Sequence, residues 1–201
     1  MTRTGRGIVV VAAGSALVLA LAACGTPPWD QSGAATGGAT PSPTSTRIVV
    51  VHNDLQTGST KRTLKAGDIT LDVTYFSTLD IGRWYADANK PLSLTAVASL
   101  GTDVGQGVYL SKVTMTTTVR GPKGALPAPA AQVDQSTVPP GYFIKQPFSY
   151  SQTFVVPPVA PSATSATFSI VYELLLQTGA SSSTYAKETA SDSVTVTFPA
   201  R

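Results

Sequence analysis

Apolar and polar side chains alternate along most of the chain after residue 46. In the run from Ile69 to Tyr75, for example, the apolar positions are separated by Thr70, Asp72 and Thr74. Side chains of a β-strand point alternately to opposite faces, so a period of two predicts a strand with one face on a core. Many of the alternating positions hold β-branched or aromatic residues, which strands favour.

Seven segments of this kind are predicted, at residues 47–52, 69–75, 92–100, 109–119, 148–156, 168–176 and 194–198. The residues expected to face the core in the fourth and fifth segments are Tyr109, Val113, Met115, Val119, Phe148, Tyr150, Phe154 and Val156. Residues 166–176 are apolar on both faces and are expected at the centre of a sheet. The best helical candidate is 79–88. Strands without crossover helices predict an all-β, antiparallel β-sandwich of about seven strands, similar in architecture to immunoglobulin-like or fibronectin-like domains.

The first 23 residues have a different pattern. Residues 1–7 contain Arg3 and Arg6 and no acid, and residues 8–20 are apolar apart from Gly14 and Ser15. A basic start, a short apolar run and a stretch of small residues are typical of a secretory signal peptide. The apolar run is also shorter than the roughly 20 residues that a membrane-spanning helix needs.

The residues that end this segment, Leu21-Ala22-Ala23-Cys24, resemble the lipobox of bacterial lipoproteins. The resemblance implies that Cys24, the only cysteine of the chain, becomes the first residue of the mature protein and carries lipid on its sulfur. Two or three acyl chains hold a protein stably on a bilayer, whereas one chain is marginal. We therefore expect a protein anchored by lipid to the cell membrane, on its extracytoplasmic face.

A tether is expected between the anchor and the folded domain. Residues 25–46 are rich in Gly, Pro, Ser, Thr and Ala, and Trp29 is their only large apolar residue. Such a composition cannot bury enough surface to offset chain entropy, so we predict a disordered tether with a mean reach of about 25 Å. The expected organisation is a signal peptide at 1–23, a lipidated tether at 24–46 and a β-sandwich at 47–201.

Removal of the signal peptide changes the charge. The chain has 14 Lys and Arg and 11 Asp and Glu, and the loss of Arg3 and Arg6 lowers its net charge from +3 to +1. The only basic cluster left contains Lys61, Arg62 and Lys65, so nucleic acid is not expected as a partner. The richness in Ala, Thr, Gly, Ser and Val is typical of a high-GC bacterium such as an actinobacterium.

Residue counts argue against a metal site and against catalysis. Copper needs imidazole, thiolate or thioether ligands, and the domain offers only His52 and Met115. A Ser-His-Asp triad would have to use His52, and no Gly-x-Ser-x-Gly motif is present. We expect no cofactor, no metal and no catalytic residue, while a catalytic aspartate pair and calcium binding stay open. The acids considered for calcium are Asp54, Asp68, Asp72 and Asp80.

The longest connection between predicted strands is the best candidate for a binding surface. Residues 121–147 include six prolines, and typical loops have roughly 4–6 residues in total. Near the end of this connection, Tyr142, Phe143 and Ile144 either contact a ligand or cover the end of the core. Trp84 and Tyr85 present the same alternative, and these five are the candidate binding residues.

Two functions are therefore considered. The leading hypothesis is a non-enzymatic lipoprotein of the cell envelope, a protein-interaction or structural module whose partner is another envelope protein. The alternative is a lipoprotein that binds a glycan, a lipid or a small solute through aromatic residues of its loops. A cavity or an exposed aromatic platform would favour the alternative, and converging polar side chains around His52 would favour an enzyme.

Overall fold

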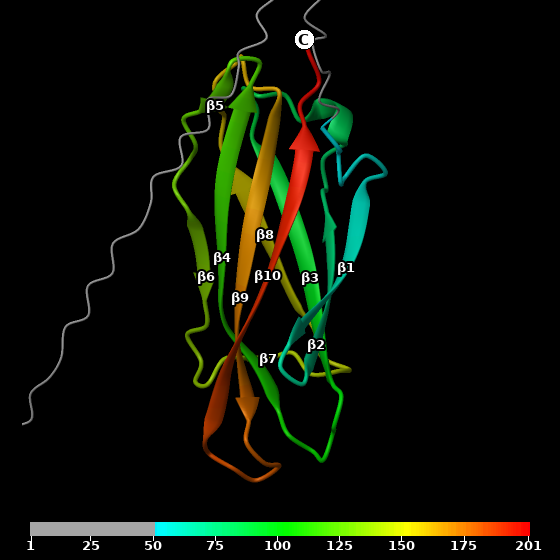
Figure 1. The fold of residues 1–201 in the computed structure, drawn as a ribbon, viewed down its shortest axis with the longest axis vertical. Helices are drawn as coiled ribbons and strands as arrows, with labels where there is room; N and C mark the ends of the chain where they lie inside the picture. The colour runs from blue at the N-terminus through cyan, green and yellow to red at the C-terminus, as the bar shows by residue number, and fades with distance from the viewer. Residues whose placement is uncertain (1–50) are drawn as a thin grey trace, which may run out of the picture. The chain divides into compact units, whose positions relative to one another are not determined.

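The computed structural model describes residues 51–201, which form two antiparallel β-sheets packed face to face (Figure 1). The strands are β1 (Ser59–Ala66), β2 (Ile69–Phe76), β3 (Lys90–Leu100), β4 (Val108–Gly121), β5 (Gly124–Leu126), β6 (Gln132–Gln135), β7 (Tyr142–Phe143), β8 (Tyr150–Val156), β9 (Ser165–Gln177) and β10 (Tyr185–Thr197). One sheet has the order β1-β2-β3-β8, and the other has the order β10-β9-β4-β5, with β6 and β7 also paired to β4. The predicted all-β sandwich is confirmed, with ten described strands rather than seven.

The additional strands lie where the alternation is weak or short. β1 was not predicted because its inward positions include the polar residues Thr60 and Arg62. The connection 121–147 is not one long loop, since β5, β6 and β7 pair in turn with β4. The predicted strand at 47–52 is wrong for Val51 and His52, which belong to no strand, and its other residues lie outside the described part.

The helical candidate at 79–88 contains only a short 3-10 turn, η2 (Ile81–Arg83). The carboxylate of Asp80 accepts a hydrogen bond from the backbone N–H of Gly82 at 2.7 Å and so caps this turn. The connection then brings Trp84 into the end of the core, where its ring meets Phe168 edge to face at 6.1 Å. The indole N–H donates to the hydroxyl of Ser77 at 3.1 Å, which satisfies its polar group.

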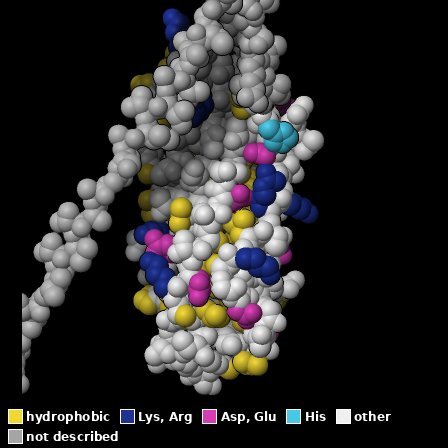
Figure 2. Space-filling view, in the orientation of Figure 1, with side chains coloured by type: hydrophobic (Ala, Val, Ile, Leu, Met, Phe, Trp, Pro, Cys, Tyr) yellow, Lys and Arg dark blue, Asp and Glu magenta, His cyan; other side chains and the backbone are white. Residues whose placement is uncertain are grey.

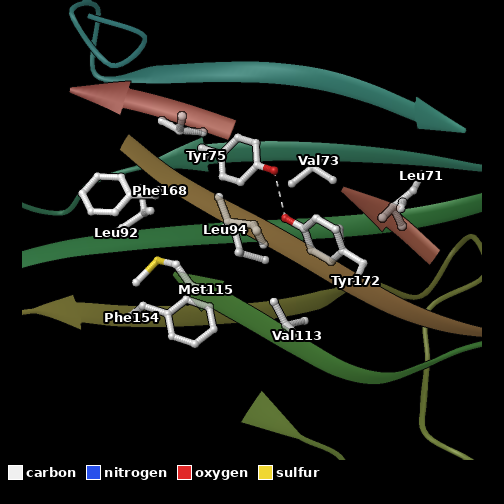
Figure 3. Packing of buried hydrophobic residues seen from close by; sticks show 14 of the residues in the cluster. Leu71, Val73, Tyr75, Leu92, Leu94, Val113, Met115, Phe154, Phe168 and Tyr172 are labelled. Atoms are coloured by element: carbon white, nitrogen blue, oxygen red, sulfur yellow. Dashed lines mark hydrogen bonds between the residues drawn. The ribbon is translucent and has the colours of Figure 1, made fainter. Parts of the chain in front are cut away.

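Alternate side chains of both sheets fill the space between them. Figure 3 shows this packing for Leu71, Val73, Tyr75, Leu92, Leu94, Val113, Met115, Phe154, Phe168 and Tyr172. The hydroxyls of Tyr75 and Tyr172 lie 2.9 Å apart inside the core and satisfy each other (Figure 3). Burial raises the pKa of both tyrosines above its usual range, so the hydroxyls stay protonated.

Charged side chains close the side of the sandwich between β1 and β10. Arg62 points inward from β1, and its Nη2 lies 2.7 Å from Oδ1 of Asp54. Its Nε lies 3.9 Å from Oδ2 of Asp192, which points inward from β10. Asp54 also fastens the start of the described chain to the edge of β10: its N–H donates to the carbonyl of Thr195 at 2.8 Å, and its Oδ2 accepts from the N–H of Thr195 at 2.7 Å.

Lys90, at the start of β3, is fully buried. Its ammonium group donates to backbone carbonyls from two connections and lies 5.3 Å from the ring centroid of Phe198. The acceptors are the carbonyl oxygens of Tyr85, Ala86, Ala88 and Pro157, at 2.5 to 3.4 Å. Burial lowers the pKa of Lys90 from 10.5 to about 8, because an ammonium group loses its hydration there.

The lowered pKa of Lys90 predicts a stability that rises with pH. Between pH 8 and 10.5 the unfolded chain binds more protons at this residue than the folded chain, so the free energy of unfolding increases through this window. We expect the urea midpoint to rise between about pH 7.5 and pH 9.5, and Lys90→Met to lack that rise. The same pH dependence in both proteins would contradict the expectation. The pH series stops below pH 10. Above that pH the unfolded chain releases the protons of Tyr75 and Tyr172, whereas the folded chain keeps them because their pKa values are raised, so the free energy of unfolding falls.

Candidate functional site

The two ends of the sandwich can be told apart by the chain segments that meet there (Figure 1). At one end, which we call the near pole, Asp54 at the start of the described chain contacts Thr195 close to the C-terminus. The opposite end, the far pole, holds the beginning of β4 at Val108 and the beginning of β10 at Tyr185. β4 runs from Val108 at the far pole to Arg120 at the near pole, which is about 40 Å for an extended strand of that length.

Four aromatic side chains form a continuous row at the far pole, which we call the aromatic row. In spatial order they are Tyr185, Tyr109, Phe143 and Phe148, with ring centroids 5.7, 5.3 and 5.2 Å apart and each pair edge to face. They come from β10, β4, β7 and the connection before β8. Phe143 is 38% exposed and Phe148 is 57% exposed. The row therefore offers apolar ring surface to solvent at one place on the molecule.

A β-bulge turns Tyr109 toward this row. The pairing of β4 with β9 shifts between Leu110 and Lys112, so the alternation of β4 changes phase at that point. Val113 and Met115 face the core as predicted, but Tyr109 lies on the opposite face of the strand, and its predicted place in the core is wrong. Its ring lies against Gly107, where an added Cβ would be 2.7 Å from the ring carbon Cε2, so a larger residue there would displace the ring.

A groove opens beside the aromatic row, between β8 and the β6–β7 segment, at the edges of the two sheets. This edge groove has a volume of about 410 Å³ and is lined by Asp134, Tyr142, Phe143, Ser149, Tyr150, Ser151 and Gln152. The rings of Tyr142 and Tyr150 stack in it, with centroids 5.5 Å apart and planes 29° apart. Phe143 lines the groove and also belongs to the aromatic row, so the two features adjoin at this residue.

The edge groove carries one carboxylate. The hydroxyl of Tyr150 donates to Oδ2 of Asp134 at 2.6 Å. Burial raises the pKa of Tyr150, and the hydrogen bond to Asp134 raises it further, so the hydroxyl remains the donor. Within the described residues this carboxylate forms no ion pair, and the groove lining contains no Lys, Arg or His. The groove thus combines aromatic rings, hydroxyls and an amide with an uncompensated negative charge.

The structure places the five predicted binding residues in three different settings. Trp84 and Ile144 are fully buried, as in the second of the two alternatives, in which they cover the ends of the core. Tyr85 is half-buried at the near pole, where the guanidinium of Arg201 lies 4.9 Å from its ring centroid. Tyr142 and Phe143 remain, and both line the edge groove.

The other members of this surface were missed from the sequence. Phe148 was expected to face the core with Tyr150, yet it lies outside β8 and is exposed. Tyr185 and Asp134 lie in segments without a predicted strand, and nothing local marks them as neighbours of Tyr142. A period of two cannot reveal these positions, because the contacts join segments that are distant in sequence.

In the described part of the chain, the polar residues considered for catalysis lie apart from one another. His52 is exposed, and its Nε2 lies 3.6 Å from Oδ1 of Asp54 (Figure 2). Glu173 faces outward between Lys112 and Lys187, which hold the pKa of its carboxyl below the usual range. Among residues 51–201 no group of three His, Cys, Asp or Glu side chains is placed to hold a metal ion.

The chain matches no protein-family model, and no curated protein matches it in sequence. No helix in the described part is long and apolar enough to cross a membrane. The aromatic row and the edge groove at the far pole are the candidate functional site.

Proposed function

We propose that the protein is a non-enzymatic binding module of the cell envelope, held at the extracytoplasmic face of the membrane by lipid on Cys24. It contacts another envelope protein through the aromatic row and the adjoining edge groove. The observation that carries the proposal is the exposure of Phe143 and Phe148 side by side, in line with Tyr109 and Tyr185.

The composition of the far pole supports a contact surface. Aromatic residues are enriched at the centres of protein interfaces, where they bury large areas at low entropic cost. Val104 and Val138 are also exposed, in the connections before β4 and before β7. Exposed apolar side chains grouped at one place, as in the aromatic row, are typical of contact surfaces.

The position of the far pole also suits this role. The described chain begins at the near pole, so the expected tether reaches the domain there, about 40 Å along β4 from the aromatic row. A lipid anchor upstream of that point leaves the row on the side of the domain away from its attachment. The aromatic row is then accessible to other envelope proteins.

One observation favours the alternative function, binding of a small ligand. The edge groove is open to solvent and has polar groups beside aromatic rings, and side chains of both kinds orient ligands in binding sites. The two functions share the same residues, and they differ in whether the groove receives a side chain of a partner or a free molecule.

Site-specific crosslinking in cells that make the full lipoprotein tests the proposed contact. A photo-crosslinking amino acid at position 148 should give one discrete protein adduct. The same amino acid at Thr116, exposed on the outer face of the second sheet, should give none. In a second protein with the crosslinker at position 143, Phe148→Ser should reduce the adduct about tenfold, because a central aromatic contact is lost. Equal adducts at positions 148 and 116, or no adduct at 148, would contradict the proposal.

A further inference from the structure

We propose that β8 is a strand-pairing site for a second copy of this chain. Two molecules join their β8 strands antiparallel about a two-fold axis that passes through Thr153, so that the sheet with the order β1-β2-β3-β8 continues from one copy into the other. This inference is independent of the proposed function, because it uses the edge of a sheet rather than the aromatic row.

The first argument is that one side of β8 has no described strand beside it. β8 ends the order of its sheet and pairs only with β3. Val155 lies opposite Pro91, which has no N–H to donate, and the carbonyl of Val155 accepts a hydrogen bond from Nε2 of Gln132 at 3.0 Å. The backbone groups of Val155 therefore point away from β3. Because this direction alternates along a strand, those of Thr153 and Ser151 also point outward.

Two of these outward groups are bonded to side-chain amides. The carbonyl of Val155 accepts from Gln132, and the N–H of Thr153 donates to Oε1 of Gln152 at 2.8 Å. A carboxamide has the same kinds of donor and acceptor as a peptide group. The two glutamines thus occupy positions that the peptide groups of a neighbouring strand would take, and such a strand would replace them.

The second argument is that β8 lacks the features by which sheet edges avoid pairing, which are charges, prolines, bulges and very short strands. β1 carries two lysines and the inward-pointing Arg62. β10 has the inward-pointing Asp192, and Asp54 covers it at Thr195. β5, β6 and β7 have only three, four and two residues. β8 has seven residues, none of them charged or proline, and its register with β3 is unbroken.

The third argument is the open space along this side of β8. The edge groove, of about 410 Å³, follows the strand from Ser149 to Gln152. Ser151 and Thr153 are exposed, and Val155 is 50% exposed. A paired strand lies 4.7–4.9 Å from its neighbour, and the groove leaves room for it beside the first half of β8.

The fourth argument identifies the occupant as a second copy. The two-fold arrangement places Thr153 opposite Thr153 of the second copy, and Ser151 opposite its Val155. Since β8 is neutral, no like charges meet, and a Thr–Thr pair across two strands is favourable. Both open edges are used at once, and the edges of the joined sheet are then the two β1 strands, which carry charge. Association along this sheet therefore ends at two copies.

Disulfide crosslinking of the purified full lipoprotein in neutral detergent tests both the pairing and its register. The chain has no cysteine besides Cys24, the proposed site of lipid, so a substituted cysteine is the only free thiol. Thr153→Cys should give a disulfide-linked dimer on mild oxidation, because residues opposite each other in such a pair have Cα atoms about 5.5 Å apart, within the range of a disulfide. The unaltered protein and Thr116→Cys should give none.

Val155→Cys is the matched control for the register. Val155 is also exposed, but the two copies of residue 155 are separated by four residues along the strands, or about 14 Å. Val155→Cys alone should therefore give no disulfide-linked dimer, whereas a mixture of Val155→Cys and Ser151→Cys proteins should give the mixed dimer. A dimer of equal yield in Val155→Cys and Thr153→Cys would indicate indiscriminate collision and would overturn the proposal.

A charge at the two-fold axis provides a second measurement. Thr153→Lys places two lysines opposite each other and should raise the dissociation constant of the dimer about tenfold, as followed by sedimentation equilibrium. Thr116→Lys, on the outer face of the other sheet, should leave that constant unchanged. An equal urea midpoint in the two lysine variants shows that the fold is kept.

Two further results would overturn the proposal: no disulfide-linked dimer from Thr153→Cys, or an unchanged dissociation constant in Thr153→Lys. Failure of the dimer is distinguishable from failure of the proposed function. The dimer forms from the purified protein alone and should be unaffected by Phe148→Ser, whereas the adduct at position 148 requires another envelope protein and forms only in cells.

Discussion

Trp84→Ala is expected to lower the free energy of unfolding by about 4 kcal/mol, a large part of the stability of a domain of this size. The indole is fully buried between the two sheets at the near pole, edge to face with Phe168. Its removal deletes a large apolar volume and leaves a cavity that the flanking strands cannot fill. The substitution also removes the hydrogen bond that the indole N–H donates to the hydroxyl of Ser77. Urea denaturation followed by circular dichroism measures the change.

The neighbouring residue provides the matched control. Tyr85 is half-buried, and its ring contacts Arg201 at the surface. Tyr85→Ala should cost about 1 kcal/mol or less, since it removes an exposed cation–π contact and leaves the core intact. Comparable losses in the two variants would contradict the assignment of Trp84 to the core and Tyr85 to the surface.

Cys24→Ala is expected to abolish lipid attachment completely. The thiol of Cys24 is the proposed acceptor of lipid, and alanine offers no nucleophile to replace it. Metabolic labelling with an alkyne fatty acid should mark the unaltered protein and give no signal from the variant. The variant should also keep the size of the uncleaved precursor. Gly25→Ala, one residue beyond the lipobox, is the control and should be labelled and cleaved normally. Labelling that persists in Cys24→Ala would rule out this residue as the anchor.

The strands of the core could be predicted because their inward positions are consistently apolar. The segment 69–75 alternates without interruption and forms β2, with Leu71, Val73 and Tyr75 buried. The segment 166–176 is apolar on both faces, and β9 does lie between β10 and β4. In these places the burial of one face, or of both, determines the local pattern.

The misplaced elements have identifiable physical causes. β1 is an edge strand whose inward Arg62 serves the ion pairs with Asp54 and Asp192, so its pattern is polar. The bulge after Leu110 reverses the facing of Tyr109, and a strict period of two cannot include such a change. β5, β6 and β7 have three, four and two residues, too few for any period to be visible.

The site could be predicted only in part for a related reason. Tyr142 and Phe143 are conspicuous as aromatics near the end of a long connection, and both lie at the far pole. Asp134 and Tyr150, which complete the edge groove, come from separate segments joined by one hydrogen bond. Such a pairing follows from how the edges of two sheets meet, and this depends on the whole topology rather than on local sequence.

The attachment of Asp54 to β10 has a mechanical consequence. Any pull transmitted along the chain from its N-terminal side reaches the described fold at Asp54, which is tied to Thr195 by two hydrogen bonds and to Arg62 by an ion pair. The load is thus shared at once between β10 and β1, one strand from each sheet. Tension is therefore applied at a point where contacts already join the two sheets. The aromatic row lies at the opposite end of the domain, away from the point where the force is applied.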